Sequence, residues 1–140
     1  MSEEQITVLI ADDEVRITEL IKDFLNASGY NALVAYDGEE ALKIFNEHSE
    51  ISLVILDIMM PEMDGWQVCR EIRKTSNKPV ILLTARAEEF DQLMGFESGA
   101  DDYVTKPFSP AVLVKRIEAL LRRSNAADFV PNDNKGLVIN

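Results

Sequence analysis

The sequence has little cysteine and histidine, the residues that build disulfides and zinc sites. It contains one of each, Cys69 and His48, among 140 residues, so an internal disulfide is excluded and a metal role for His48 is not expected. A single cysteine is compatible with a reducing compartment. The N-terminus lacks the basic start and apolar run of a signal peptide. We therefore predict a cytoplasmic location.

Basic residues and long apolar runs are also scarce. The chain carries 14 Lys and Arg against 25 Asp and Glu, a formal net charge of −11. This balance repels phosphate backbones and anionic membranes, so the segment is not expected to bind DNA by itself. No apolar run approaches the roughly 20 residues that span a bilayer. The 46% hydrophobic content suffices for one core of ordinary size, so we expect one domain and a tail.

What the sequence does contain is five short apolar runs that alternate with segments of helical periodicity. The runs occupy residues 6–12, 31–37, 51–57, 79–85 and 101–106. This alternation predicts an α/β fold with a parallel sheet covered by helices on both faces. The first, third and fourth runs are almost wholly apolar, as central strands of such sheets are. We therefore predict a flavodoxin-like doubly wound (βα)5 fold with strand order 2-1-3-4-5.

The last part of the chain has a different composition. From Ser124 onward the helical spacing of apolar residues is lost, and Pro131 and Gly136 appear. This change predicts a folded domain in residues 1–123 and a linker in residues 124–140 that leads toward an effector domain not present here. The final "GLVIN" resembles the start of another strand.

Chemically active side chains follow four of the five expected strands. They are Asp12 and Asp13 after the first, Asp57 after the third, Thr84 after the fourth and Lys106 after the fifth. Parallel strands end at one edge of the sheet, so these groups are expected to meet there. Clustered carboxylates repel one another unless a cation lies between them. Oxygen ligands of this kind suit Mg²⁺, which also accepts a phosphate oxygen.

This set of residues fits phosphoryl transfer. Asp57 can act as a nucleophile and form an acyl phosphate, while Thr84 and Lys106 can contact the phosphoryl oxygens. The turn "MMPEMDG" can leave the main-chain carbonyl of Met59 free to bind the metal. Taken singly, each aspartate could be a helix cap or turn former, and Lys106 could be a surface lysine. Their joint placement favours the phosphorylation site.

Four stretches resemble the receiver domain of bacterial two-component response regulators. They are "ADDE" (11–14), "LDIMMPEMDG" (56–65), "LLTAR" (82–86) and "GADDYVTKPF" (99–108). The resemblance covers about residues 5 to 123. It is nearest to the branch that carries a winged-helix DNA-binding domain, because "GADDYVTKPFSP" followed by "RR" is typical there.

The resemblance implies a phosphorylation-activated switch rather than an enzyme in the ordinary sense. Asp57 would accept a phosphoryl group from a phosphohistidine on a sensor histidine kinase, with Mg²⁺ held by the three aspartates and the Met59 carbonyl. Thr84 and Lys106 would contact the phosphoryl oxygens, and Tyr103 would be the aromatic switch that responds to Thr84. The Lys106–Pro107 bond is usually cis in this family.

The same resemblance implies a homodimer formed on phosphorylation through the fourth helix, fifth strand and fifth helix. Asp102 and Arg116 stand where one cross-subunit ion pair is expected, although they could equally form a solvated local pair. Gln92 and Val112 replace a basic and an acidic residue that the family frequently has, so at least one pair is missing. Gly95 lowers helix propensity in the fourth helix, which would ease its displacement.

Three other functions are compatible with parts of the pattern. A stand-alone receiver in a phosphorelay is opposed only by the strand-like end of the tail. An aspartate-nucleophile phosphatase would carry a D-x-D motif after the first strand, where this chain has the adjacent pair Asp12 and Asp13. A flavin-binding module would need a Gly-rich or hydroxyl-rich phosphate loop there, whereas "ADDEV" repels phosphate.

Overall fold

The computed structural model describes residues 5–85 and 99–129. Five parallel strands form one sheet in the order β2-β1-β3-β4-β5, which confirms the predicted topology. The strands are β1 (Thr7–Ala11), β2 (Asn31–Ala35), β3 (Ile51–Asp57), β4 (Val80–Thr84) and β5 (Asp102–Thr105).

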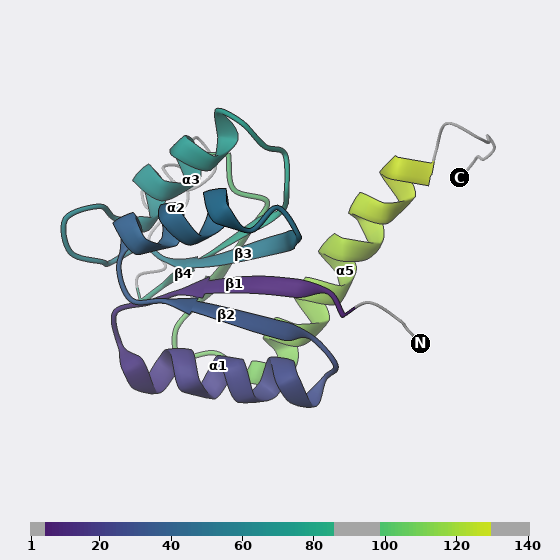
Figure 1. The fold of residues 1–140 in the computed structure, drawn as a ribbon. Coiled ribbons are helices and arrows are strands. Elements are labelled where there is room, and N and C mark those ends of the chain that lie inside the picture. Colours follow the sequence, from purple (N-terminus) through teal and green to yellow (C-terminus); the bar gives the residue numbers. More distant parts are fainter. Residues whose placement is uncertain (1–4, 86–98, 130–140) are drawn as a thin grey trace.

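Helices cover both faces of the sheet, as predicted (Figure 1). The helices are α1 (Val15–Ala27), α2 (Gly38–Glu47), α3 (Gly65–Arg73) and α5 (Pro110–Phe129). Figure 1 shows α2 and α3 against one face and α1 and α5 against the other. The helix expected between β4 and β5, with Arg86, Gln92 and Gly95, lies outside the described residues.

Burial follows the position of each strand in the sheet. Every residue of β1 and β4 is buried, and β3 has a single half-buried residue, Ser52. The outer strands β2 and β5 are only partly buried. Because a central parallel strand is covered on both faces, its residues are mostly apolar. The two hydrophobic cores lie on opposite faces of the sheet.

Helix α5 is longer than the sequence periodicity indicated. It continues to Phe129, past Ser124, where the helical spacing of apolar residues ends. Ala126 and Ala127 are strong helix formers, and adding a residue to an existing helix needs no new nucleation. The last turns of α5 extend past the sheet (Figure 1). The division between a domain and a linker near this point stays a prediction.

No helix within residues 5–85 and 99–129 is long and apolar enough to cross a membrane.

Candidate functional site

Three carboxylates meet where β1 and β3 end. Asp12, Asp13 and Asp57 each place an oxygen so that all three atoms lie within 4.8 Å of one another. Asp12 and Asp57 are buried, with 0% and 3% of their surfaces exposed, whereas Asp13 is exposed. The structure therefore brings together all three aspartates that the sequence predicted as metal ligands.

The turn after β1 holds Asp12 in place through hydrogen bonds to the backbone. Its own N–H donates to the carbonyl of Ala35 at 3.2 Å, and its carboxylate accepts the N–H of Glu14 at 2.9 Å. These bonds orient the Asp12 side chain across the end of the sheet. Asp13 follows directly and stays open to solvent.

Asp57 is positioned by a loop that folds back tightly on the end of β3. The N–H of Gly65 donates to the carbonyl of Ile58 at 3.0 Å, and a Cβ on Gly65 would lie 2.5 Å from the Asp57 carbonyl oxygen. Only glycine permits this approach. Asp64 then begins α3 with a capping box, in which its side chain and that of Gln67 each bond the other's backbone. The predicted turn is confirmed, while the role of the Met59 carbonyl stays a prediction.

Lys106 brings the positive charge to this cluster. Its ammonium lies 3.1 Å from Asp12 Oδ2, 3.3 Å from Asp57 Oδ1 and 3.3 Å from Glu14 Oε1. The backbone N–H of Lys106 also donates to the Thr84 carbonyl at 2.7 Å. The bond from Lys106 to Pro107 is cis, as the resemblance implied.

The single Lys106 ammonium faces several carboxylates, and burial together with their charges shifts the pKa values of the site. Burial, reinforced by the charge of Asp12, raises the pKa of Asp57 to about 6. Burial likewise raises the pKa of Asp12, although the Glu14 N–H and Lys106 oppose it. Burial lowers the pKa of Lys106, but its bond to Asp12 and the charge of Asp57 outweigh this, so the net change is upward. Uncompensated negative charge on oxygen ligands fits a hard divalent cation such as Mg²⁺.

Thr84 and Tyr103 occupy neighbouring strands near this edge. Thr84 is the last residue of β4 and is buried, with 1% of its surface exposed. Tyr103 pairs in register with Leu82, its hydroxyl oxygen is buried, and its ring packs against the core on the α2 and α3 face. This arrangement is compatible with the predicted switch pair, whose action stays a prediction.

A pocket opens directly above Asp57. Its volume is about 300 Å³, and its lining consists of Asp13, Glu14, Asp57, Met59, Ala85 and Lys106. The pocket is open to solvent on the side of Glu14 and Met59, whose surfaces are largely exposed. A small phosphate compound fits a space of this size.

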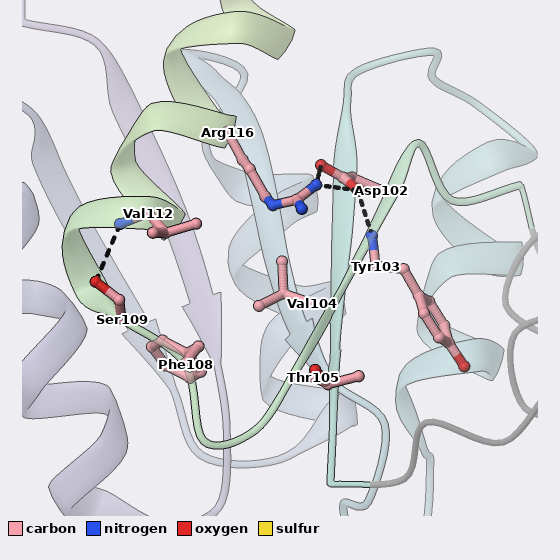
Figure 2. Close-up of a pocket in the computed structure, with 8 residues that line it drawn as sticks. All are labelled: Asp102, Tyr103, Val104, Thr105, Phe108, Ser109, Val112 and Arg116. Carbon is pink, nitrogen blue, oxygen red and sulfur yellow. Dashed lines mark hydrogen bonds and ion pairs between the residues drawn. The ribbon is translucent and has the colours of Figure 1, made fainter.

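Asp102 and Arg116 form an ion pair within one chain (Figure 2). The Arg116 guanidinium donates to both carboxylate oxygens of Asp102, at 3.0 and 2.9 Å. The pair lines a cavity of about 420 Å³ between β5 and α5, where Val112 is half exposed. The local pair is thus observed, and its predicted part in a dimer interface stays a prediction.

Sequence reasoning assigned no role to two residues that the structure places in polar clusters. Glu14 was noted only as part of "ADDE", although its position next to two site aspartates was a usable signal. Arg73 gave no signal, yet its guanidinium donates to the Gly99 carbonyl at 2.9 Å, the Lys78 carbonyl at 2.8 Å and the Asp101 carboxylate at 2.6 Å.

A comparison with known families agrees with this fold and this site. The family model of the response regulator receiver domain matches residues 8–118. The chain belongs to this family, whose members are regulators rather than classical enzymes.

Similar proteins indicate to which branch of the receiver family this chain belongs. A probable transcriptional regulator ycf27 from Cyanidium caldarium is 51% identical over 132 residues, which are 93% of this chain and 53% of that protein. The transcriptional regulatory protein CpxR of Escherichia coli K12 is 43% identical over 129 residues, 92% of this chain and 55% of that protein. The chain thus spans about half the length of these relatives, and their class confirms the predicted branch of the family.

Solved structures show the same fold. The receiver domain of the Francisella response regulator 1452 superimposes with a TM-score of 0.81 at 38% identity, covering 86% of this chain and 99% of that one. The BeF3-activated receiver domain of Klebsiella pneumoniae RstA gives a TM-score of 0.78 at 31% identity, covering 83% and 98%.

Proposed function

We propose that this receiver domain accepts a phosphoryl group on Asp57 from a phosphohistidine of a sensor histidine kinase. The observation that carries the proposal is the position of the Asp57 carboxylate. It lies in the pocket above β3, beside two further aspartates and the Lys106 ammonium.

The residues present can perform each part of this transfer. An Asp57 oxygen attacks phosphorus, a P–O bond forms, and the P–N bond to the kinase histidine breaks with its electron pair returning to the imidazole nitrogen. Lys106 and Thr84 would contact the phosphoryl oxygens as the charge moves. Because such transition states are loose, positioning and charge neutralisation supply most of the catalysis.

The donor set fits Mg²⁺, which we propose is held by Asp12, Asp13, Asp57 and the Met59 carbonyl. When bound, it would offset the carboxylate charge and bind a phosphoryl oxygen. The raised pKa of Asp57 is compatible with this assignment, because a cation between the carboxylates would offset the repulsion from Asp12 that adds to the effect of burial.

We further propose that phosphorylation changes the face formed by β5, α5 and the segment between β4 and β5. Thr84 and Tyr103 would transmit the change, and Asp102 with Arg116 would contribute to a homodimer. A C-terminal domain that binds DNA would then control transcription in the cytoplasm, as the names and lengths of the relatives suggest. Residues 1–123 would be the receiver and 124–140 the connection to that domain.

The test is phosphorylation with a small donor. The protein is incubated with Mg²⁺ and acetyl phosphate and then weighed by mass spectrometry, beside the Asp57→Asn variant. One labile phosphate that is present in the wild type and lost in the variant supports the proposal. Sustained turnover of unrelated phosphate esters would instead identify an aspartate-nucleophile phosphatase, and no label in either protein would overturn the assignment of Asp57.

A further inference from the structure

Glu14 is the outermost of the three carboxylates that share the Lys106 ammonium. Its Oε1 lies 3.3 Å from Lys106 Nζ, and its side chain is 64% exposed. The other two partners, Asp12 and Asp57, are buried. Of these three carboxylates, Glu14 is therefore the one that solvent and ligands meet on their way to the Lys106 ammonium.

The backbone of Glu14 is fixed, while its side chain is not used for the helix that it begins. Glu14 is the N-cap residue of α1, and its N–H donates to Asp12. Its carbonyl accepts the N–H groups of Ile17 and Thr18, at 3.0 and 3.2 Å. An N-cap side chain ordinarily accepts a backbone N–H of the first turn, but that of Glu14 makes no such bond. Its carboxylate is instead directed to Lys106.

Glu14 also lines the pocket through which a phosphoryl donor must pass to reach Asp57. The lining contains three carboxylates, those of Asp13, Glu14 and Asp57, and one ammonium, that of Lys106. A pocket with this balance lowers the local concentration of anions. Of the three carboxylates, only Glu14 was not needed for the proposed metal site.

We infer that Glu14 is a specificity-determining residue that disfavours small anionic phosphoryl donors. Its carboxylate repels the incoming anion and competes for the Lys106 ammonium that would receive a phosphoryl oxygen. A donor histidine presented by a protein supplies binding energy from contacts outside the pocket, and that energy offsets this penalty. The inference rests on the proposed phosphorylation of Asp57.

The test compares two small donors of different charge. Acetyl phosphate is a dianion at neutral pH, whereas phosphoramidate is a zwitterion with a net single negative charge. The second-order rate constant for phosphorylation is measured with each donor, in Mg²⁺, for the wild type, Glu14→Gln and Glu19→Gln. Glu19 is an exposed residue of the same helix outside the pocket lining, so its variant removes the same charge from the chain.

Glu14→Gln is expected to raise the rate constant for phosphorylation by acetyl phosphate about 3- to 5-fold, and that for phosphoramidate about half as much. Both gains should shrink at about 0.5 M salt. Glu19→Gln is expected to match the wild type. Equal gains with both donors that persist at high salt, or no gain at all, would overturn the inference. A wild type that neither donor phosphorylates would refute the proposed function instead.

A second measurement separates this role from metal binding. Mg²⁺ affinity can be followed by the fluorescence of Trp66, which lines a pocket together with Asp13. If Glu14 acts on the donor and on Lys106, Glu14→Gln changes this affinity by no more than about twofold. A tenfold loss would show that Glu14 is a metal ligand and would overturn its assignment as a specificity residue.

Discussion

Lys106 donates a hydrogen bond of 3.1 Å to Asp12, a residue 94 positions earlier in the chain. Both side chains are largely withdrawn from water, at 15% and 0% exposure. The bond joins the ends of β5 and β1, which are not neighbours in the sheet. Because Lys106 is shared with Asp57 and Glu14, no single carboxylate is fully neutralised, and the site retains net negative charge.

The first prediction concerns the stability cost of this charge. The pKa of Asp57 is raised from 3.8 to about 6 in the folded chain, so the folded state binds this proton more tightly than the unfolded state does. The resulting stability is fully present below about pH 4 and is lost as the pH rises through about 6. Asp57→Asn removes the ionised group. It should raise the free energy of unfolding by about 1–3 kcal/mol at pH 7.5 without Mg²⁺, and by little at pH 4.

Urea denaturation at the two pH values measures this difference. Asp23→Asn, at an exposed position of α1, is the control for loss of one negative charge. An Asp57→Asn variant no more stable than the wild type at pH 7.5 would contradict the raised pKa.

The second prediction concerns Mg²⁺. Asp13 is exposed, so Asp13→Asn should fold normally while removing one ligand of the proposed site. Mg²⁺ at about 100 times its dissociation constant should stabilise the wild type by about 2.7 kcal/mol. At that same concentration Asp13→Asn should show a clearly smaller gain. Thermal melts with and without Mg²⁺ measure this, with Glu47→Gln as control; identical gains in wild type and Asp13→Asn would refute the ligand role.

Much of this site can be predicted from the sequence because the carboxyl ends of parallel strands lie at the same end of the sheet. Once the apolar runs were ordered as a sheet, Asp12, Asp57 and Thr84 had to lie near one another, and only their separations were unknown. The same reasoning cannot choose partners for long exposed side chains. Lys106 reaches Glu14 as well as the aspartates, a contact that depends on the three-dimensional path of both side chains.

Helical periodicity gave the position of α1 but not its contacts. Leu20 and Phe24 fall in the apolar stripe of the helix, yet they are 43% and 38% exposed. The buried face is centred on Ile21 and Leu25 and includes Thr18, whose hydroxyl donates to the Val15 carbonyl at 2.8 Å. The rotation of a helix about its axis, and hence which side chains it buries, depends on the elements packed against it. The sequence of the helix alone does not specify those elements.

The third prediction concerns Arg73, which ties the end of α3 to the chain before β5. Its partner Asp101 also accepts the N–H of Val80 at 2.8 Å, so the two residues align the starts of β4 and β5. Arg73→Met leaves these acceptors without their donor and should lower the free energy of unfolding by about 1–3 kcal/mol. Arg70→Met, at an exposed position of the same helix, should change it little.

A double-mutant cycle with Asp101→Asn, followed by urea denaturation, isolates the pair. A coupling energy of about 1 kcal/mol or more is expected for groups in direct contact. Additive effects of the two substitutions would show that Arg73 acts through its carbonyl contacts alone.

The fourth prediction concerns Gly65, the glycine packed against the backbone of Asp57. A Cβ at Gly65 would lie 2.5 Å from the Asp57 carbonyl oxygen and 3.0 Å from the Ile58 Cα, and backbone atoms cannot rotate away as a side chain can. Gly65→Ala must therefore displace the end of β3. We expect a loss of about 1–3 kcal/mol in stability and a weaker affinity for Mg²⁺, because the Asp57 carboxylate moves with its backbone.

Gly29→Ala is the matched control for this fourth prediction. Gly29 has a φ of +94° with open space around its Cβ position, and it precedes β2 at the end of the sheet opposite the site. Its substitution should cost about 1 kcal/mol through backbone strain alone and leave Mg²⁺ affinity unchanged. If both variants lose stability but only Gly65→Ala loses Mg²⁺ affinity, the close contact positions the carboxylate. If Gly65→Ala keeps full affinity, the loop after β3 adapts without moving Asp57.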